Sequence, residues 1–158
     1  MAKQSSTART LDLAGRFEKV RHDHRTETAE DYVELIADLV ERNGEARIVD
    51  IAACFGVSSP TVNKVITRLR GEGLVTGRPY RGVFLTEEGQ ALADKARARH
   101  ETVVRFLRTL GITPRTAEAD AEGIEHHVSE ETLAAFRKAI EEAEDGDRIG
   151  SVNHPSTC

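Results

Sequence analysis

The segment GVSSPTVNKVITRL, residues 56–69, decides the fold of this chain. Gly56 can end a helix, because glycine adopts the left-handed backbone of a helix C-terminus without strain. Ser58 is a typical N-cap, and Pro60 suits the first helical position, where its missing N–H is not needed. Apolar residues then recur at helical spacing, at Val62, Val65, Ile66 and Leu69. The segment therefore predicts a tight turn between two helices, of which the second starts near Pro60.

The flanking segments extend this motif on both sides. Upstream, apolar spacing predicts helices over about residues 30–42 and 49–55, each followed by a glycine that can end it. Downstream, apolar residues at 74–75 and 83–85 flank a turn cluster at 77–82 that carries two arginines, which predicts a hairpin with a basic tip. This order is that of a winged helix-turn-helix, whose second motif helix enters the DNA major groove.

Polar side chains gather on the outer face of the predicted recognition helix and on the hairpin. Thr61 and Asn63 could meet base edges, whereas basic side chains such as Lys64 are better suited to phosphates, which set affinity and register. The predicted DNA-binding residues are Ser58, Ser59, Pro60, Thr61, Asn63, Lys64, Arg68, Arg78 and Arg81. An ordinary helical bundle with a solvated basic face is the alternative, but it does not explain why a polar cap, a turn glycine and a basic hairpin occur together.

The second half of the chain predicts three more helices. Thr86 opens a long helix to about Leu110, and Pro114 and Glu130 begin two more by the same signals. The first residues show only a short apolar pattern, and the Gly-, Ser- and Pro-rich tail shows none. The sequence thus predicts a mostly α protein with a flexible extension over residues 1–25, a winged helix-turn-helix DNA-binding domain over 26–86, a helical domain over 87–144 and a disordered tail over 145–158.

Charge is distributed unevenly along the chain, whose net charge is −5. Residues 58–82 carry five basic side chains against one acidic, and residues 114–147 carry three basic against eleven acidic. One stretch suits a polyanion and the other suits cations. Because no apolar run approaches the roughly 20 residues that cross a bilayer, and no signal-peptide pattern opens the chain, we expect a cytoplasmic protein without a membrane partner.

The segment EGIEHH, residues 122–127, is the richest in metal-ligand chemistry. On a helix, Glu122, Glu125 and His126 lie at i, i+3 and i+4, so their side chains can converge on one site. An acidic pair at helical spacing is more often a solvated face than a metal site, so this pattern alone is not specific. Further candidates with the same chemistry lie on other predicted helices: Asp31, Glu34 and His100.

Five short motifs together resemble the manganese-responsive members of the diphtheria toxin repressor family. They are DYVELI at 31–36, GVSSPTVNK at 56–64, YRGVFLT at 80–86, RHE at 99–101 and EGIEHH at 122–127, and the last is highly specific for that family. The resemblance implies an amino-terminal winged helix, a carboxy-terminal helical dimerisation domain and a homodimer. It also implies the metal ligands, which fall on Asp31, Glu34, His100, Glu122, Glu125 and His126.

The chemistry of these ligands favours manganese. Four carboxylates and two imidazoles form a hard set with a total charge of −4, which can neutralise two divalent cations, so we predict two Mn²⁺ per subunit. Iron-sensing relatives have a softer Met or Cys at the positions of Asp31 and Glu122. The resemblance therefore implies a manganese-dependent transcriptional regulator that binds a double-stranded DNA operator and represses manganese uptake genes when Mn²⁺ is bound.

Three alternatives to a manganese regulator remain open. A ferrous-iron-dependent regulator of the same fold is the main one. A dimetal carboxylate enzyme is disfavoured, because such bundles use Glu-x-x-His motifs and this chain has none. A regulator of small organic ligands would need an apolar pocket, for which the aromatic content of 4% is low. We therefore predict that the chain is not an enzyme.

Overall fold

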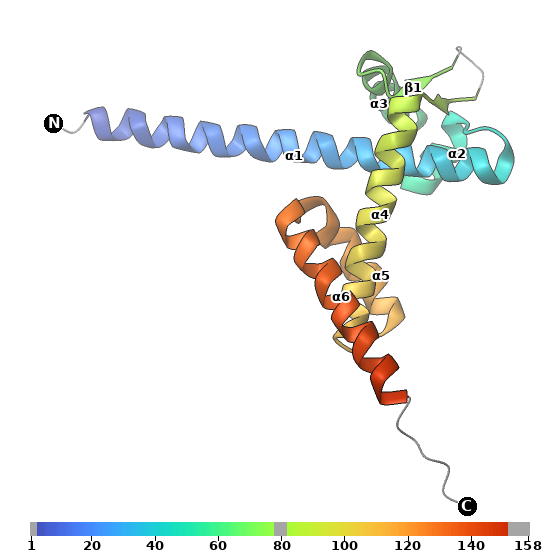
Figure 1. The fold of residues 1–158 in the computed structure, drawn as a ribbon. Helices are drawn as coiled ribbons and strands as arrows, with labels where there is room; N and C mark the ends of the chain where they lie inside the picture. The colour runs from blue at the N-terminus through green and yellow to red at the C-terminus, as the bar shows by residue number, and fades with distance from the viewer. Residues whose placement is uncertain (1–2, 78–81, 152–158) are drawn as a thin grey trace, which may run out of the picture. The chain divides into compact units, whose positions relative to one another are not determined.

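The computed structural model describes the backbone of residues 3–77 and 82–151, and the side chains of residues 23–77 and 82–145. Within these residues the chain is mainly helical with one small sheet (Figure 1), as predicted. It forms two compact units, of which the first ends at Ala93 and the second begins at Asp94. Among the described helices, none has the length and apolar character needed to cross a membrane.

The first unit is built on three helices: α1 (Lys3–Asn43), α2 (Ile48–Phe55) and α3 (Ser59–Gly71). Gly56 follows α2 with a positive φ of 65°, the left-handed conformation that glycine adopts without strain. The Ser58 hydroxyl accepts a hydrogen bond from a backbone N–H in the first turn of α3, which satisfies one of the free donors at the helix start. The predicted helix-turn-helix is therefore confirmed.

A two-stranded hairpin completes the first unit. Strand β1 (Val75–Thr76) pairs antiparallel with β2 (Phe84–Leu85), so that Thr76 lies opposite Phe84. The N–H of Val83 donates to the carbonyl of Ala46 at 2.7 Å, which ties the hairpin to the segment between α1 and α2. The hairpin confirms the predicted wing, whose basic tip at residues 78–81 lies outside the described residues.

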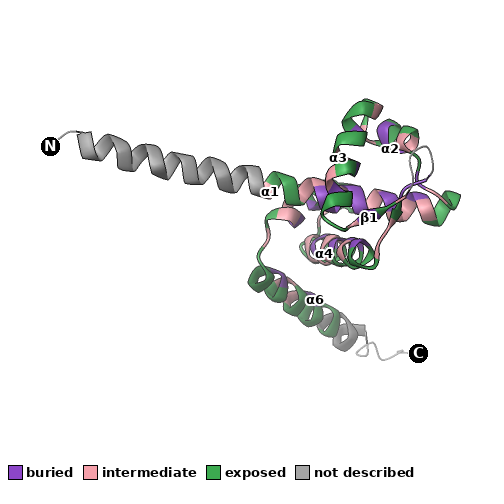
Figure 2. Cartoon of the chain, turned by 90° about the horizontal axis from the view of Figure 1, so that it is seen from above, coloured by how far each residue is buried: buried purple, intermediate pink, exposed green. Residues whose placement is uncertain are grey.

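The core of the first unit is apolar. Figure 2 shows buried positions on the inner faces of α1, α2 and α3. The rings of Tyr32 and Phe55 stack with centroids 4.5 Å apart. The largest fully buried side chains of this core are Ile36, Ile51, Val62 and Leu69. Since burial of one such side chain contributes about 1.5–3 kcal/mol, this core fixes the orientation of α3.

The second unit contains the later part of α4 (Glu87–Thr109), α5 (Pro114–Ile124), the 3₁₀ turn η1 (Glu125–His127) and α6 (Glu130–Ser151). Its core is smaller than that of the first unit. The buried members are Val103, Val104, Ala117, Ala121 and Leu133. Because two of them are alanines on α5, that helix can approach α4 closely, which decides where the polar side chains of the two helices meet.

Two helix boundaries differ from the prediction. The helix predicted to start near residue 30 begins at Lys3, and the last helix continues to Ser151 rather than ending near residue 144. No proline interrupts residues 3–43, and Gly15 is the one glycine there, so a helix that tertiary contacts nucleate near residue 30 can extend toward the amino end at little cost. The limits of the functional domains stay predictions.

Candidate metal centre and nucleic-acid interface

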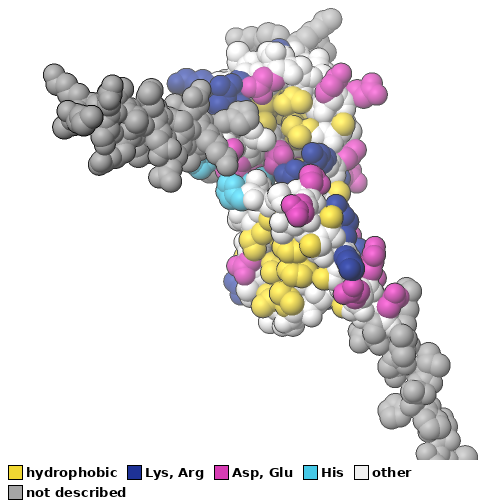
Figure 3. Space-filling view, turned by 60° about the vertical axis from the view of Figure 1, so that its left-hand side comes forward, with side chains coloured by type: hydrophobic (Ala, Val, Ile, Leu, Met, Phe, Trp, Pro, Cys, Tyr) yellow, Lys and Arg dark blue, Asp and Glu magenta, His cyan; other side chains and the backbone are white. Residues whose placement is uncertain are grey.

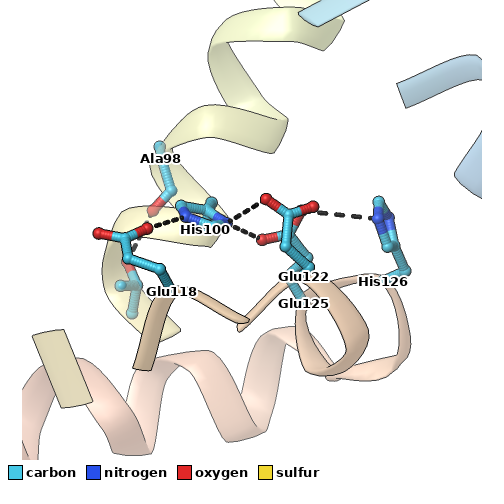
Figure 4. A network of polar contacts seen from close by, with 7 residues as sticks. Ala98, His100, Glu118, Glu122, Glu125 and His126 are labelled. Atoms are coloured by element: carbon cyan, nitrogen blue, oxygen red, sulfur yellow. Dashed lines mark hydrogen bonds and ion pairs between the residues drawn. The ribbon is translucent and has the colours of Figure 1, made fainter. Parts of the chain in front are cut away.

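Acidic and imidazole side chains from three consecutive elements meet in the second unit (Figure 4). His100 projects from α4, Glu122 from α5, and Glu125 and His126 from the 3₁₀ turn η1. The spacing argument assumed one continuous helix through residues 122–126, but α5 ends at Ile124. The tighter turn of η1 therefore directs Glu125 inward.

The imidazole of His100 lies between carboxylates. Its Nδ1 is 2.5 Å from Oε2 of Glu125 and 3.9 Å from Oε1 of Glu122. Its Nε2 is 2.9 Å from Oε2 of Glu118. The other carboxylate oxygen of Glu125, Oε1, lies 3.5 Å from Nε2 of His126. The cluster thus brings together four of the six ligands that the family resemblance implies.

Burial gives these groups unusual protonation energetics. Glu125 is 3% exposed, and this burial raises the pKa of its carboxyl group, although the charge of His100 and its hydrogen bond offset part of the effect. Burial alone lowers the pKa of His100, but the hydrogen bonds to Glu118 and Glu125 and the charge of Glu125 outweigh it and raise that pKa. A buried carboxylate is costly unless a positive charge lies beside it, so the centre favours a cationic partner.

The donor chemistry of the cluster fits a hard divalent cation. Carboxylate oxygens and imidazole nitrogens are the ligands that Mn²⁺ and similar ions use. In the arrangement observed the donors contact one another directly, and within the described residues no three or more His, Cys, Asp or Glu side chains are spaced to surround one ion. A cation would thus replace the hydrogen bond between His100 and Glu125.

The other two predicted ligands, Asp31 and Glu34, lie on α1 in the first unit. Both side chains are half-buried, and their spacing of three residues places them on one face of the helix, as the sequence predicted. Their part in the metal centre stays a prediction.

Glu118 is a member of the cluster that sequence reasoning missed. It lies four residues before Glu122 on α5, so the two side chains project from the same face of that helix. This i, i+4 spacing was a signal that could have found it. The pair of Glu118 and Glu122 did not stand out in the sequence, because residues 114–147 contain eleven acidic residues.

The recognition helix α3 exposes most of its predicted DNA-binding residues. Of these, Pro60, Thr61, Asn63 and Lys64 are exposed, Ser58 just before the helix is exposed, and Ser59 is half-buried. Ser58 and Thr61 also contact each other through their hydroxyl oxygens at 2.9 Å, as part of the helix cap. Asn63 and Lys64 are exposed and lie outside this cap, and the DNA contacts of all these residues stay a prediction.

Arg68 is held differently from the other predicted DNA-binding residues. Its Nη1 donates to the backbone carbonyl of Arg25 at 3.2 Å and lies 3.4 Å from Oε1 of Glu72. Arg25 contacts the same carboxylate at 3.3 Å. Arg68 thus connects α3 to α1 within the unit, whereas the wing arginines Arg78 and Arg81 lie outside the described residues.

Comparison with known families accounts for both halves of the chain. The model of the iron dependent repressor N-terminal DNA binding domain matches residues 24–83. The model of the iron dependent repressor metal binding and dimerisation domain matches residues 86–149. The fold and the polar centre thus belong to a metal-dependent transcriptional regulator with a winged helix, which confirms that the chain is not an enzyme. The chain belongs to the iron-dependent repressor family.

Two named relatives show which members of this family the chain resembles. The transcriptional regulator MntR of Escherichia coli O6:H1 is 58% identical over 121 residues, which are 77% of this chain and 78% of that protein. The HTH-type transcriptional regulator MntR of Bacillus subtilis is 34% identical over 122 residues, 77% of this chain and 86% of that protein. The resemblance found in the sequence motifs is therefore confirmed.

Solved structures show the same fold. The manganese regulator SloR matches with a TM-score of 0.60 and 30% identity, over 82% of this chain and 55% of that one. A manganese-dependent transcriptional repressor in complex with manganese matches with a TM-score of 0.65 and 29% identity, over 72% of this chain and 52% of that one. The chain spans about half the length of these solved chains.

Proposed function

We propose that this regulator binds Mn²⁺ and, in that state, represses genes for manganese uptake by binding their promoters as a homodimer in the cytoplasm. The observation that carries the proposal is the buried carboxylate of Glu125, which lies between the imidazoles of His100 and His126. In its charged form such a group is stable only beside a positive charge, which protonated His100 supplies without metal and a bound cation can supply in its place. The solved manganese regulators of the same fold and the MntR relatives support manganese as the source of that charge.

The predicted ligand set supports manganese over softer metals. The six residues are Asp31, Glu34, His100, Glu122, Glu125 and His126, and none of them carries sulfur. Four carboxylates can balance two divalent cations, so we propose two Mn²⁺ per subunit. Ferrous iron accepts the same donors, and affinity alone would not exclude it. Selectivity between the two metals then depends on geometry and on the supply in the cell.

The proposed mechanism couples the two units through the ligands. Without a cation, the carboxylates of Asp31 and Glu34 would repel those of Glu122 and Glu125. The cation supplies the positive charge that lets these groups share one site, and α1 then takes a fixed orientation relative to the second unit. In a dimer, this shifts an existing equilibrium toward the state in which two recognition helices match successive major grooves.

A homodimer suits the surface of the second unit. Figure 3 shows apolar side chains exposed together on this unit. Leu110, just after α4, is 62% exposed. Exposed apolar patches on soluble proteins commonly mark interaction surfaces, and the matched family domain is a dimerisation domain.

The direct test is an electrophoretic mobility shift on the promoter of a manganese uptake gene, with Mn²⁺ and with chelator. We expect Mn²⁺ to raise the DNA affinity by about 5- to 150-fold, the usual range of allosteric coupling. Replacement of Glu122 with Ala should abolish this gain, whereas replacement of Asp120, an exposed acid on the same helix, should preserve it. Equal affinity of the wild-type protein in both conditions would rule out the proposed linkage.

A calorimetric titration under anaerobic conditions tests the metal itself. We expect two equivalents of Mn²⁺ per subunit, and a gel shift in parallel should show whether Fe²⁺ also activates DNA binding. Sedimentation equilibrium of the same sample should give a dimer. A single equivalent would contradict the binuclear site, and activation by Fe²⁺ alone would favour the ferrous regulator.

A further inference from the structure

The side of the His100 ring that faces away from Glu122 and Glu125 has its own carboxylate partner. Nε2 of His100 lies 2.9 Å from Oε2 of Glu118, whereas Nδ1 faces the other two carboxylates (Figure 4). The two nitrogens of one ring therefore have separate neighbours. This separation matters because a neutral imidazole has one lone pair for a metal and one N–H to donate.

We propose that Glu118 is a positioning residue of the metal centre, which accepts the Nε2–H of His100 and so leaves the Nδ1 lone pair directed toward Glu122 and Glu125. This inference rests on the proposed metal-dependent function. Histidines that bind metals almost always donate their second ring N–H to a carboxylate, a carbonyl or water, which fixes the tautomer and orients the ring. Glu118 does not itself need to touch the ion.

The local packing explains why Glu118 can perform this role. Ala117 and Ala121 on α5 are fully buried and share one core with Val103 and Val104 on α4. This core holds the two helices together near His100, so the carboxylate of Glu118 comes from a fixed backbone position. Outer-shell groups that rigid elements carry orient a ligand better than groups on loops.

A plain surface ion pair is the competing interpretation. Glu118 is 61% exposed, and an exposed pair contributes about 0–1 kcal/mol to stability with no necessary effect on metal affinity. The two interpretations differ in what happens when a neutral hydrogen-bond acceptor replaces the carboxylate. If Glu118 positions His100, E118Q keeps part of the effect on metal affinity because its amide oxygen still accepts the N–H. E118A loses the effect because it has no acceptor.

The test measures Mn²⁺ affinity by calorimetry for the wild-type chain and for the variants E118A, E118Q and D120A. Because outer-shell substitutions cost about 10- to 100-fold in metal affinity, and Glu118 is exposed, we expect E118A to lose about tenfold. E118Q should keep the affinity within about threefold of wild type, since its amide oxygen still accepts the N–H. D120A removes the same charge two residues further along the helix, on its opposite side, and should leave the affinity within about twofold.

A spectroscopic readout separates orientation from charge. In the Zn²⁺-loaded protein, ¹⁵N–¹H correlation spectra of the imidazoles should show the His100 proton on Nε2 and shifted by a strong hydrogen bond. E118A should lose this shift and E118Q should retain part of it. Unchanged spectra in E118A, equal affinity of E118A and wild type, or an equal loss in D120A would each overturn the positioning role.

Failure of this inference can be told from failure of the proposed function. If wild-type chain binds Mn²⁺ and shifts DNA in response to it, while E118A behaves in the same way, the role of Glu118 alone is wrong. If the wild-type chain neither binds Mn²⁺ nor responds to it, the proposed manganese-dependent function and the positioning role of Glu118 are both wrong.

Discussion

Leu69 and Glu125 are both buried, one in each unit, and they show how differently the two units are stabilised. Leu69 lies on the recognition helix within a core of branched aliphatic side chains. Glu125 lies on a 3₁₀ turn and contacts two imidazoles, next to a smaller core that contains two alanines. The first unit therefore holds its shape mainly by apolar burial, which ions hardly affect, although it too has a buried acid, Glu30. Part of the second unit depends on charges that a cation or a proton can change.

Truncation in the first core should have the largest effect on stability. Leu69 is fully buried, so Leu69→Ala removes packed methyl groups and leaves a cavity, at a cost of about 2–5 kcal/mol. Urea unfolding in the presence of chelator measures this loss. Arg70→Ala on the exposed side of the same helix is the control and should change stability by less than about 0.5 kcal/mol. A loss below about 1 kcal/mol for Leu69→Ala would contradict an apolar origin of the stability of this unit.

Neutralisation of the buried carboxylate should have opposite effects with and without metal. At a Mn²⁺ concentration of about 100 Kd, binding stabilises the folded wild-type protein by about 2.7 kcal/mol, and Glu125→Gln should lose most of this gain. Without metal, the variant should be at least as stable as wild type, because burial raises the pKa of Glu125 and so disfavours its charged form. Thermal melts with Mn²⁺ and with chelator measure both effects.

The control for this charge change is Glu141→Gln, an exposed acid on α6. It should leave both melts as they are in wild type. If Glu125→Gln instead destabilised the metal-free protein and kept the gain from Mn²⁺, Glu125 would be a structural residue and not a ligand.

The junction between the hairpin and α4 should be sensitive to a single methyl group. A Cβ on Gly89 would lie 1.9 Å from the carbonyl oxygen of Leu74, which also accepts a hydrogen bond from the N–H of Thr86 at 3.0 Å. Gly89→Ala should therefore cost about 1–3 kcal/mol through forced backbone movement. Gly71→Ala has open space around its Cβ and should stabilise by up to about 1 kcal/mol. Equal melting temperatures for the two variants would contradict this close contact.

The smallest expected effect is a pH dependence confined to the second unit. The folded state raises the pKa of His100, so the stability that this group contributes is present at low pH and is lost as pH rises above about 6.5, its value in unfolded chains. In chelator, the melting temperature of the wild type should fall as the pH rises above about 6.5, and His100→Gln should flatten this slope. With Mn²⁺ the stabilisation should rise with pH instead, because ligands bind metal in their deprotonated form. A metal-free slope unchanged in His100→Gln would assign it to another group.

Local signals predicted the helix-turn-helix well. Gly56, Ser58 and Pro60 each act on the backbone within a few residues, so their effects do not depend on the rest of the fold. The start of α1 was predicted poorly for the opposite reason. No residue between Lys3 and the predicted start near residue 30 forces a helix to begin or to stop, so cooperative extension of the helix decided it.

The polar cluster around His100 was predicted in part, and its role in metal binding stays a prediction. Residue type and helical spacing brought Glu122, Glu125 and His126 together, but the assumed continuous helix was wrong, since α5 ends at Ile124. The carboxylate of Glu118 became visible through its contact with His100, eighteen residues before it. The contact between Arg68 and Arg25 spans 43 residues and was likewise beyond any local pattern.

The sequence by itself determined the class of this protein: turn residues and apolar spacing predict a winged helix, and the residue types of EGIEHH at residues 122–127 predict a hard metal site. The tertiary structure alone decided which nitrogen of His100 faces which carboxylate, and that Arg68 turns back toward α1. The physical reason is range, because capping and periodicity act over a few residues along the chain. The direction of a side chain depends instead on neighbours that packing brings from distant segments.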